Sequence, residues 1–194
     1  DTSADCTYGI LAWGTDYGPA YITIQNNLVQ YVEEYGISIN DLSSNVTIND
    51  NDIKDITAAN RTDLGQIMGV GIGIGGSDNP AAVSITNNLI ETNLIGDGTT
   101  TAAGVGIGMS AAPTNVNITG NRISNNTEGI SVQSTTVPVV SSNSITGNTA
   151  YGIHNYLATP IDATGNYWGS ANGPEHDSNT YNVGSQGDAV SDNV

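Results

Sequence analysis

The chain has 194 residues, long enough for one domain with a sizeable core, and its charge is one-sided. Its 19 acidic residues are opposed by only three basic ones, Lys54, Arg61 and Arg122, which gives a formal net charge of -16. This charge argues against nucleic acid as a partner, because phosphate binding needs clustered Lys and Arg, and no apolar run approaches the roughly 18 residues of a membrane span.

Predicted strands begin at Gly9-Ile10-Leu11, and from residue 22 onward they recur around an asparagine. Apolar residues stand five and three positions before this Asn and two positions after it, as in Ile22-Thr-Ile24-Gln-Asn-Asn27-Leu-Val29. Short apolar alternation indicates β-strands, and no segment has the apolar spacing of a helix. The pattern recurs in full at Asn27, Asn51, Asn88 and Asn121, and in weaker form at Asn143 and Asn166.

Between successive asparagines, a glycine followed by alternating apolar residues marks a further strand. These strands are expected at Gly36–Ile39, Gly69–Ile72, Gly104–Ile107, Gly129–Val132 and Gly152–Ile153. The asparagines are separated by 24, 37, 33, 22 and 23 residues, and two or three short strands fit within the shorter intervals. We therefore predict one all-β domain over residues 1–194, a parallel β-solenoid of about six to seven coils.

A recurring Asn in stacked coils becomes a column with a spacing of about 4.8 Å. Each side-chain amide can then donate to the next asparagine and satisfy the backbone of the bend. The predicted asparagine ladder contains Asn27, Asn51, Asn88, Asn121, Asn143 and Asn166. We favour this structural role for the six residues over a role in ligand binding.

The two long intervals imply insertions within residues 54–68 and 91–103, each followed by a glycine-alternating strand. Gly71–Gly76 matches the nucleotide-binding pattern GxGxxG, but no helix follows it, so we do not interpret it as such a site. We expect the apolar residues of these strands to face inward and the glycines to form a bare outer strip, open to close approach by another backbone. The inward set is Val70, Ile72, Ile74, Val105, Ile107 and Met109, and the outer strip is Gly71, Gly73, Gly106 and Gly108. The two insertions are expected to cover the strip; a partner chain or a glycan strand is the alternative.

Near the C-terminus, Gly165–Pro174 contains one of the two tryptophans of the chain. Trp168 stands two residues after Asn166, at an inward position of the repeat, and is expected to fill the end of the core. The alternative is that Tyr167 and Trp168 form a platform on which a sugar ring stacks.

The carboxylates that are candidates for catalysis are Asp41, Asp50, Asp52, Asp55 and Asp63, close together in sequence. Of these, we single out Asp50 and Asp52, with Arg122 as the only plausible base, two coils away. Hydrolysis of a glycosidic bond needs at least two flanking carboxylates. No second carboxylate recurs at the position of Asp52, which aligns with Leu28, Leu89, Arg122, Ser144 and Tyr167. We interpret this region as a solvated acidic loop. Weak calcium binding by Asp50, Asp52 and Asp55 is the alternative, although the spacing is not that of an EF-hand.

Other polar motifs are less informative. His154 and His176 are single and distant in sequence, which predicts no metal site. Cys6 is the only cysteine, so no internal disulfide forms, and we expect a small core residue or an unpaired surface thiol. Sequons that permit N-glycosylation in a suitable host occur at Asn45, Asn60, Asn117 and Asn125, at a frequency that this composition produces by chance.

The coil pattern resembles the right-handed parallel β-helix repeats of pectate-lyase-like proteins and of the carbohydrate-binding and sugar-hydrolysis type of domain, NosD-like proteins included. Gly165–Pro174 with Gly187–Val194 resembles the NWWG…GP…GxAVSxNV segment that closes β-helix domains in many bacterial and archaeal surface proteins. The resemblance implies a right-handed β-helix and a polypeptide that continues past Val194. Its enzymes use clustered carboxylates, with calcium and a basic residue in lyases or paired acids in hydrolases.

The acidic, lysine-poor composition suits a high-salt or extracellular setting, where salt screens self-repulsion and the charge keeps the protein soluble. Because neither a repeated carboxylate pair nor a basic groove is present, we expect a non-catalytic extracellular or cell-surface β-helix module without a cofactor. It would act as a structural, adhesive or filament-forming unit, joined end to end with copies of itself or with adjoining domains of the same polypeptide. The alternative is a β-helix protein that binds or cleaves a polysaccharide.

Overall fold

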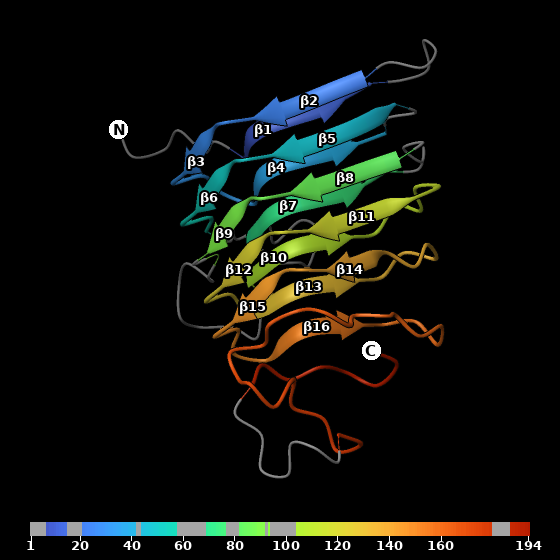
Figure 1. Cartoon of the computed structure of the whole chain (residues 1–194). Coiled ribbons are helices and arrows are strands. Elements are labelled where there is room, and N and C mark those ends of the chain that lie inside the picture. Colours follow the sequence, from blue (N-terminus) through green and yellow to red (C-terminus); the bar gives the residue numbers. More distant parts are fainter. Residues whose placement is uncertain are drawn as a thin grey trace, which may run out of the picture.

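The computed structural model describes residues 7–14, 21–41, 44–57, 69–76, 82–91, 93, 104–179 and 187–194. Within these ranges the chain forms strands and no helix, and the strands belong to three sheets (Figure 1). Sheet A contains, in spatial order, β1 (Tyr8–Trp13), β4 (Tyr35–Asn40), β7 (Gly69–Gly75), β10 (Gly104–Met109), β13 (Glu128–Val132) and β16 (Tyr151–Asn155). Sheet B contains β14 (Val139–Ser141), β11 (Val116–Thr119), β8 (Ala82–Thr86), β5 (Asn45–Asn49) and β2 (Tyr21–Gln25). Sheet C contains β15 (Ser144–Thr146), β12 (Arg122–Ser124), β9 (Leu89–Glu91), β6 (Asp52–Lys54) and β3 (Leu28–Gln30).

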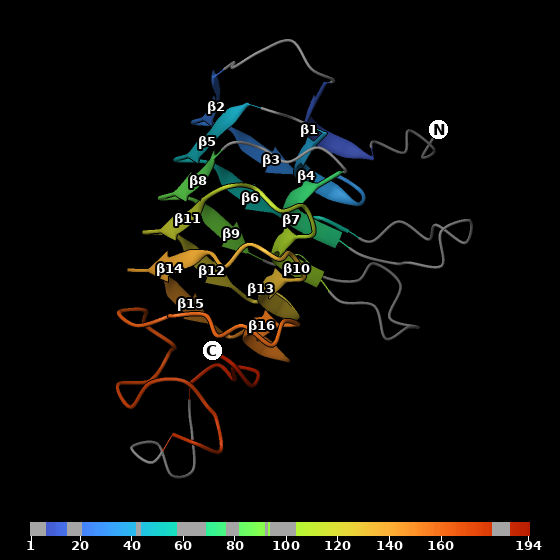
Figure 2. The same cartoon turned by 90° about the vertical axis from the view of Figure 1, so that its right-hand side faces the viewer.

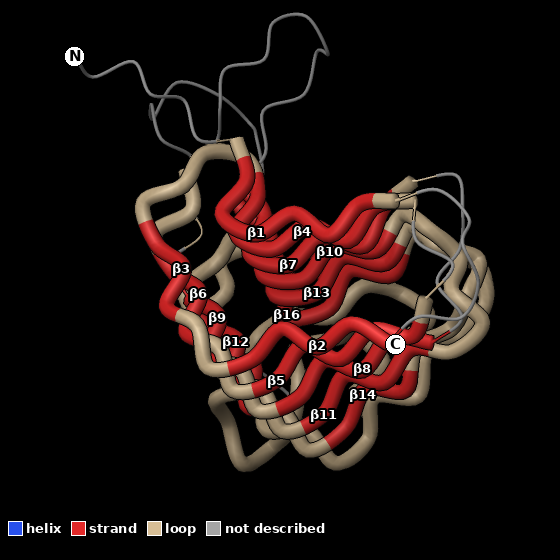
Figure 3. Tube along the Cα trace, turned by 90° about the horizontal axis from the view of Figure 1, so that it is seen from above, coloured by secondary structure: helices blue, strands red, loops and turns tan. Residues whose placement is uncertain are grey.

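Neighbouring strands are parallel in all three sheets. Seen from the side, the strands stack in layers from β1, β2 and β3 to β16 (Figure 2). Seen along the stacking direction, the strands of each sheet superimpose around one interior (Figure 3). The prediction of an all-β parallel β-helix is therefore confirmed. Most of the two predicted insertions lies outside the described residues, as does Cys6.

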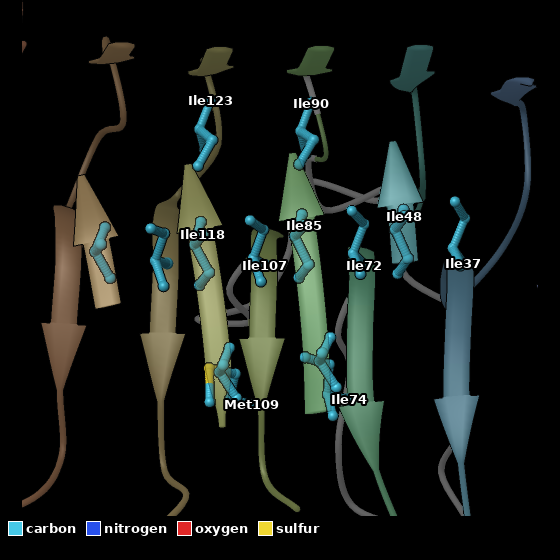
Figure 4. Packing of buried hydrophobic residues seen from close by; sticks show 14 of the residues in the cluster. Ile37, Ile48, Ile72, Ile74, Ile85, Ile90, Ile107, Met109, Ile118 and Ile123 are labelled. Carbon is cyan, nitrogen blue, oxygen red and sulfur yellow. The ribbon is translucent and has the colours of Figure 1, made fainter. Parts of the chain in front are cut away.

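The interior is filled by columns of β-branched side chains, one column for each inward position of the repeat. In sheet A the register aligns Ile37, Ile72 and Ile107, and in sheet B it aligns Ile48 with Ile85. All five side chains are fully buried, and they point into the space between the sheets (Figure 4). Ile and Val suit this position because their stiff branched side chains pack well on a pleated surface.

The chain bends from sheet B to sheet C at the residue before each ladder asparagine. Every residue at this position has a positive φ: Asn26 (57°), Asp50 (53°), Asn87 (57°), Gly120 (71°), Ser142 (60°) and Gly165 (76°). Gly, Asn and Asp tolerate the left-handed region better than other residues. In the Asn-Asn, Asp-Asn and Gly-Asn pairs of the sequence, the first residue therefore adopts the positive φ of the bend and the second is the ladder asparagine.

The six predicted asparagines form a continuous ladder. Each Nδ2 donates to Oδ1 of the asparagine one coil further on, at 2.9 Å from Asn27 to Asn51 and at 3.0 Å from Asn121 to Asn143. The same Oδ1 atoms accept the backbone N–H of the preceding asparagine, as Asn88 Oδ1 does from Asn51 at 3.0 Å. The remaining steps, Asn51 to Asn88, Asn88 to Asn121 and Asn143 to Asn166, lie at 2.9, 3.0 and 2.9 Å.

A glycine column lines the inside of sheet A, and here the expectation of a wholly external glycine strip is wrong. A β-carbon on Gly71 would lie 2.7 Å from the carbonyl oxygen of Gly106 and 2.8 Å from Cγ2 of Ile90, so Gly71 faces the core. A β-carbon on Gly106 would likewise lie 2.5 Å from the carbonyl oxygen of Gly129. The predicted alternation fails because the glycine and the isoleucine that follows it both face the interior where the chain enters the strand.

Of the four glycines expected outside, Gly73 and Gly108 do face the outer side of sheet A, and Gly73 is buried beneath the ring of Tyr35. A β-carbon on Gly73 would meet the ring of Tyr35 at 2.7 Å, and one on Gly108 would have only Val70 and Val105 within 4 Å, at 3.4 and 3.7 Å. Val70 and Val105 were expected inside. They are buried, but they do not belong to the core cluster.

Candidate functional site on the outer face of sheet A

The outward side chains of sheet A form aligned columns because the strands are parallel and in register. The column through the middle of the sheet, called the central column below, contains Leu11, Ser38, Gly73, Gly108, Ser131 and His154. Its side chains are small between the two ends of the solenoid and large at both ends. This profile makes a depression on an otherwise regular surface.

That depression is a groove of about 260 Å³, called the neutral groove below. Its described lining contains backbone and hydroxyl, amide and aromatic side chains, and none of these residues carries a charge. The lining consists of Tyr8, Tyr35, Ser38, Asn40, Val70, Gly73, Ile74, Gly75, Gly76, Gly108, Met109, Ser110, Ser131 and Gln133.

Two stacked tyrosines form the wall of the groove on its N-terminal side. The ring centroids of Tyr8 and Tyr35 are 5.6 Å apart, and their planes meet at 14°. Tyr35 lies against the bare backbone of Gly73, where any larger residue would displace the ring. Burial raises the pKa of Tyr35 above its ordinary value, and the proximity of Tyr8 and Glu34 adds to the rise. The phenol therefore stays protonated and available as a hydrogen-bond donor.

A histidine cluster stands at the C-terminal end of the same face. Glu128, which is buried, faces the Nδ1 atom of His154 at 2.7 Å and accepts a hydrogen bond from the hydroxyl of Tyr156 at 3.2 Å, both at Oε1. The imidazole lies between two aromatic rings, with centroid distances of 4.3 Å to Tyr151 and 3.8 Å to Tyr156. Burial, the charge of Glu128, its hydrogen bond and Tyr151 together raise the pKa of Tyr156 to about 12.

The C-terminal segment closes this end of the solenoid beside β16. Val190 bridges to Ile153, and Ala189 bridges to Glu175. A cavity of about 650 Å³ separates the segment from the histidine cluster, and both His154 and His176 line it. The two histidines are thus brought together despite their separation in sequence. His176 Nε2 faces Asp192 Oδ1 at 3.1 Å, and the described residues contain no group of three or more His, Cys, Asp or Glu that fits a metal ion.

The predicted catalytic candidates are not brought together. The register places Leu89 between Asp52 and Arg122, so the last two lie two strands apart, or about 10 Å at the usual strand spacing. Asp52 is paired with Lys54 at 3.0 Å, and exposed Asp50 accepts a hydrogen bond from Asn49 at the bend. The alternative calcium set, which adds Asp55, does not appear as a metal-binding group either. The alignment of Asp52 with its neighbours in sheet C is nevertheless the predicted one.

Trp168 does not provide a sugar-stacking platform, because it is only 5% exposed and belongs to the core cluster. Its Cζ3 atom lies 3.1 Å from where a β-carbon on Gly152 would be, so it fills the end of the interior. Tyr167 is 54% exposed and remains accessible. Among the sequons, Asn45 and Asn117 are half-buried on strands, Asn125 is exposed, and Asn60 lies outside the described residues.

A second ladder was missed by sequence reasoning. Asn93 Nδ2 donates to Asn126 Oδ1 and Asn126 Nδ2 to Asn148 Oδ1, both at 3.0 Å. Asp188 ends this ladder and accepts hydrogen bonds from Asn148 Nδ2 at 2.6 Å and from the backbone N–H of Gly147 at 2.7 Å. The signal was present, because Asn93, Asn126 and Asn148 each stand five residues after an asparagine of the first ladder.

The histidine cluster had a weaker signal. Aligning the repeat on Gly129 and Gly152 puts Glu128 opposite Tyr151 and Ser131 opposite His154, and Tyr156 directly follows β16. The Glu128 side chain turns toward His154 and away from solvent because of side-chain packing. The alternation of residues in the sequence does not predict that orientation.

The family comparison agrees with this architecture. The family model described as the right handed beta helix region matches residues 6–167. Searches of curated proteins and of solved structures gave no match. None of the described segments forms a helix that would be long and apolar enough to cross a membrane. Because the family model covers most of the chain and the three sheets are entirely parallel, the chain belongs to the right-handed β-helix family.

Proposed function

We propose that the chain is an extracellular or cell-surface adhesive module that binds a neutral glycan along the outer face of sheet A. The observation that carries this proposal is the neutral groove, with its uncharged lining, its glycine floor and its tyrosine wall. Ligand sites in proteins are typically concave, with aromatic walls and a few placed polar groups. Bare glycine backbone permits the close approach that a flat sugar ring needs.

The polar groups of the groove can form the same kinds of hydrogen bond as the hydroxyls of a sugar. Ser38 and Ser131 offer hydroxyls, while Asn40 and Gln133 offer amides. Hydroxyls and amides both donate and accept hydrogen bonds, as sugar hydroxyls do. The six strands of sheet A span about 24 Å at the usual strand spacing, which is room for several sugar units.

Charge selects against acidic glycans. A net charge of -16 repels a uronate-rich polymer, and the described lining of the neutral groove contains no Lys or Arg to compensate. Lys54 and Arg122 belong to sheet C, on a different side of the solenoid. The proposed ligand is therefore a neutral polysaccharide or oligosaccharide.

Calorimetric titration with neutral and with uronate oligosaccharides of equal length tests the proposal. Gly108→Leu puts a side chain into the groove and should weaken binding of the neutral glycan at least tenfold. Ser84→Leu is the matched control, because it adds the same side chain to the outward surface of sheet B, and it should leave binding unchanged. Preferential binding of the uronate, or equal binding by both variants, would contradict the proposal.

A second candidate function, end-to-end assembly, is favoured by the first coil, defined here as residues 7–14 and 21–32. None of these described residues is charged, whereas Asp16 stands in the sequence between the two ranges. It holds five of the nine exposed large apolar side chains in the described part of the chain: Leu11, Trp13, Tyr21, Leu28 and Tyr31. An exposed apolar surface of this kind marks an interaction site.

Sedimentation velocity over a range of concentrations tests the assembly function. Trp13→Glu together with Leu28→Glu should shift the protein toward the monomer. Tyr167→Glu is the control, because it charges an exposed aromatic residue outside the first coil. A wild-type protein that remains monomeric at the highest concentration contradicts assembly through this coil, and it leaves glycan binding untouched.

A further inference from the structure

We propose that Ser131, His154 and Glu128 form an acyl-transfer centre that hydrolyses an ester on the glycan in the neutral groove. Ser131 is the nucleophile, His154 the general base and Glu128 the positioning residue. That the ester joins an acyl group to a sugar rests on the proposed function. The roles of the three residues do not depend on it.

The geometry fixes the tautomer of His154. Glu128 Oε1 is a carboxylate acceptor 2.7 Å from Nδ1, so the proton of the neutral imidazole lies on Nδ1 and the lone pair on Nε2. The hydroxyl of Tyr156 donates to the same oxygen and fixes the carboxylate in turn. Aromatic rings on both sides of the imidazole, at 3.8 and 4.3 Å, hold its orientation. A base held by a carboxylate in this way is the arrangement that activates a hydroxyl nucleophile.

Ser131 is the hydroxyl nearest to this base along the central column. It is the register partner of His154, one strand away, at about 4.8 Å between backbones. Its neighbours on the strand, Ile130 and Val132, face the core, so Ser131 faces the same outer surface as His154. Ser131 is 4% exposed and lines the neutral groove, whereas His154 lines the cavity of about 650 Å³ at the C-terminal end of the same face.

Gln133 supplies the third requirement, a donor for the negative oxygen that forms during acyl transfer. It follows Ser131 by two residues, lines the same groove and is exposed. A side-chain amide can stabilise such an oxygen as a backbone N–H does.

The reaction balances with water as the only co-reactant. Ser131 Oγ attacks the ester carbonyl while His154 Nε2 takes its proton. The bond between the carbonyl carbon and the sugar oxygen then breaks, and the sugar oxygen receives the proton from Nε2. Water attacks the acyl-serine by the same route, which releases the carboxylic acid and regenerates the hydroxyl.

The lining of the groove points to an ester more than to a glycosidic bond. Glycosidic hydrolysis needs two carboxylates that flank the bond, and none of the described residues that line the groove is a carboxylate. Glu128 is already engaged by His154 and Tyr156. A single oriented base with a neighbouring hydroxyl is sufficient for acyl transfer.

A fluorophosphonate probe, which reacts with activated serines, tests the centre without any glycan. Intact mass and peptide mapping should show one adduct, on Ser131, in the wild-type protein. Ser131→Ala should abolish the adduct, and His154→Gln should slow its formation at least 100-fold. Ser144→Ala, a serine of sheet C, should label like the wild type. Circular dichroism of each variant establishes that the fold is retained, and Ser131→Gly provides a second variant because Gly108 occupies the adjacent position of the column.

Hydrolysis of 4-nitrophenyl acetate provides the second readout. Glu128→Gln should lower kcat with little change in KM, because Glu128 orients the base and does not touch the ester. A wild-type protein without a Ser131 adduct overturns the proposal, as does hydrolysis that survives Ser131→Ala. Labelling of Ser131 without glycan binding contradicts only the proposed function, and glycan binding without labelling contradicts only the acyl-transfer centre.

Discussion

Asn121 illustrates how much a single ladder residue does. It is 1% exposed, and its Nδ2 lies within hydrogen-bond distance of Ile85 O at 2.9 Å, Asn143 Oδ1 at 3.0 Å and Thr119 O at 3.2 Å. Its Oδ1 accepts from the backbone and side-chain amides of Asn88, at 2.9 and 3.0 Å. The side chain therefore satisfies backbone groups of two coils and bonds the ladder asparagine of a third, which is why a short amide recurs at this corner and an apolar residue does not.

Replacing Asn121 with alanine should lower the free energy of unfolding by about 3 kcal/mol or more, because several buried polar groups lose their partners at about 1–3 kcal/mol each. Urea unfolding measures the change. Asn117→Ala is the control, because Asn117 is half-buried and points outward from β11, and its loss should cost at most about 0.5 kcal/mol. Equal losses for the two variants would mean that the ladder contributes little to stability.

Tyr156 makes stability depend on alkaline pH. Its pKa is raised from 10.0 in the unfolded chain to about 12 in the folded protein, so the folded state holds the proton more tightly. The contribution is fully present below pH 10 and is lost as the pH rises toward 12. Urea unfolding at several pH values should show a steeper alkaline loss for the wild type than for Tyr156→Phe. Parallel curves would contradict the raised pKa.

At the scale of the element, the strands of sheet A depend on glycines that are not equivalent. A β-carbon on Gly106 would lie 2.5 Å from the carbonyl oxygen of Gly129, which is rigid backbone, whereas the nearest atom to one on Gly108 is a valine methyl at 3.4 Å. The inner glycine is required because the parallel strand beside it passes too close for a side chain. The outer glycine leaves the groove open.

Gly106→Ala should therefore destabilise the protein by about 1–3 kcal/mol through overpacking, and Gly108→Ala should change stability by less than about 1 kcal/mol. The two substitutions are chemically identical and two residues apart, so each serves as the control for the other. Thermal and urea unfolding of both variants measure the difference. A larger loss for Gly108→Ala would reverse the assignment of inner and outer faces.

The strands and their register could be predicted from the sequence, but the side of the sheet on which each residue lies could not be predicted for every residue. The spacing of Asn27, Asn51 and Asn88 predicted the ladder because a parallel solenoid forces equivalent residues into columns. Alternation then misplaced Gly71, because at a corner two successive residues turn inward. Alternation is a property of regular strands, and it carries no information about corners.

The site was harder to predict than the fold for a related reason. The emphasis on Asp50, Asp52 and Arg122 followed from counting charged residues, whereas the groove is defined by an absence of charge and of side chains. The cluster around His154 forms through a buried carboxylate from the adjacent strand. Neither feature has a local sequence motif, since both arise from the lateral contact of coils more than twenty residues apart.

At the scale of the whole molecule, the charged residues lie apart from two surfaces whose described residues carry no charge. The chain has a net charge of -16, whereas the described residues of the neutral groove and of the first coil carry no charge. Self-repulsion keeps such a molecule soluble, and it confines contacts to the uncharged surfaces. One of these surfaces lies along the side of the solenoid and suits a ligand, and the other lies at its N-terminal end and suits another protein surface.

The central claim, that the outer face of sheet A binds a neutral glycan, is tested most directly by a crystal structure with a neutral oligosaccharide at saturating concentration. The account predicts sugar density over Gly108, with one ring against Tyr35 and the chain directed toward Ser131 and His154. Density confined to exposed Tyr167, or an empty groove in a crystal whose packing leaves this face open, would contradict it.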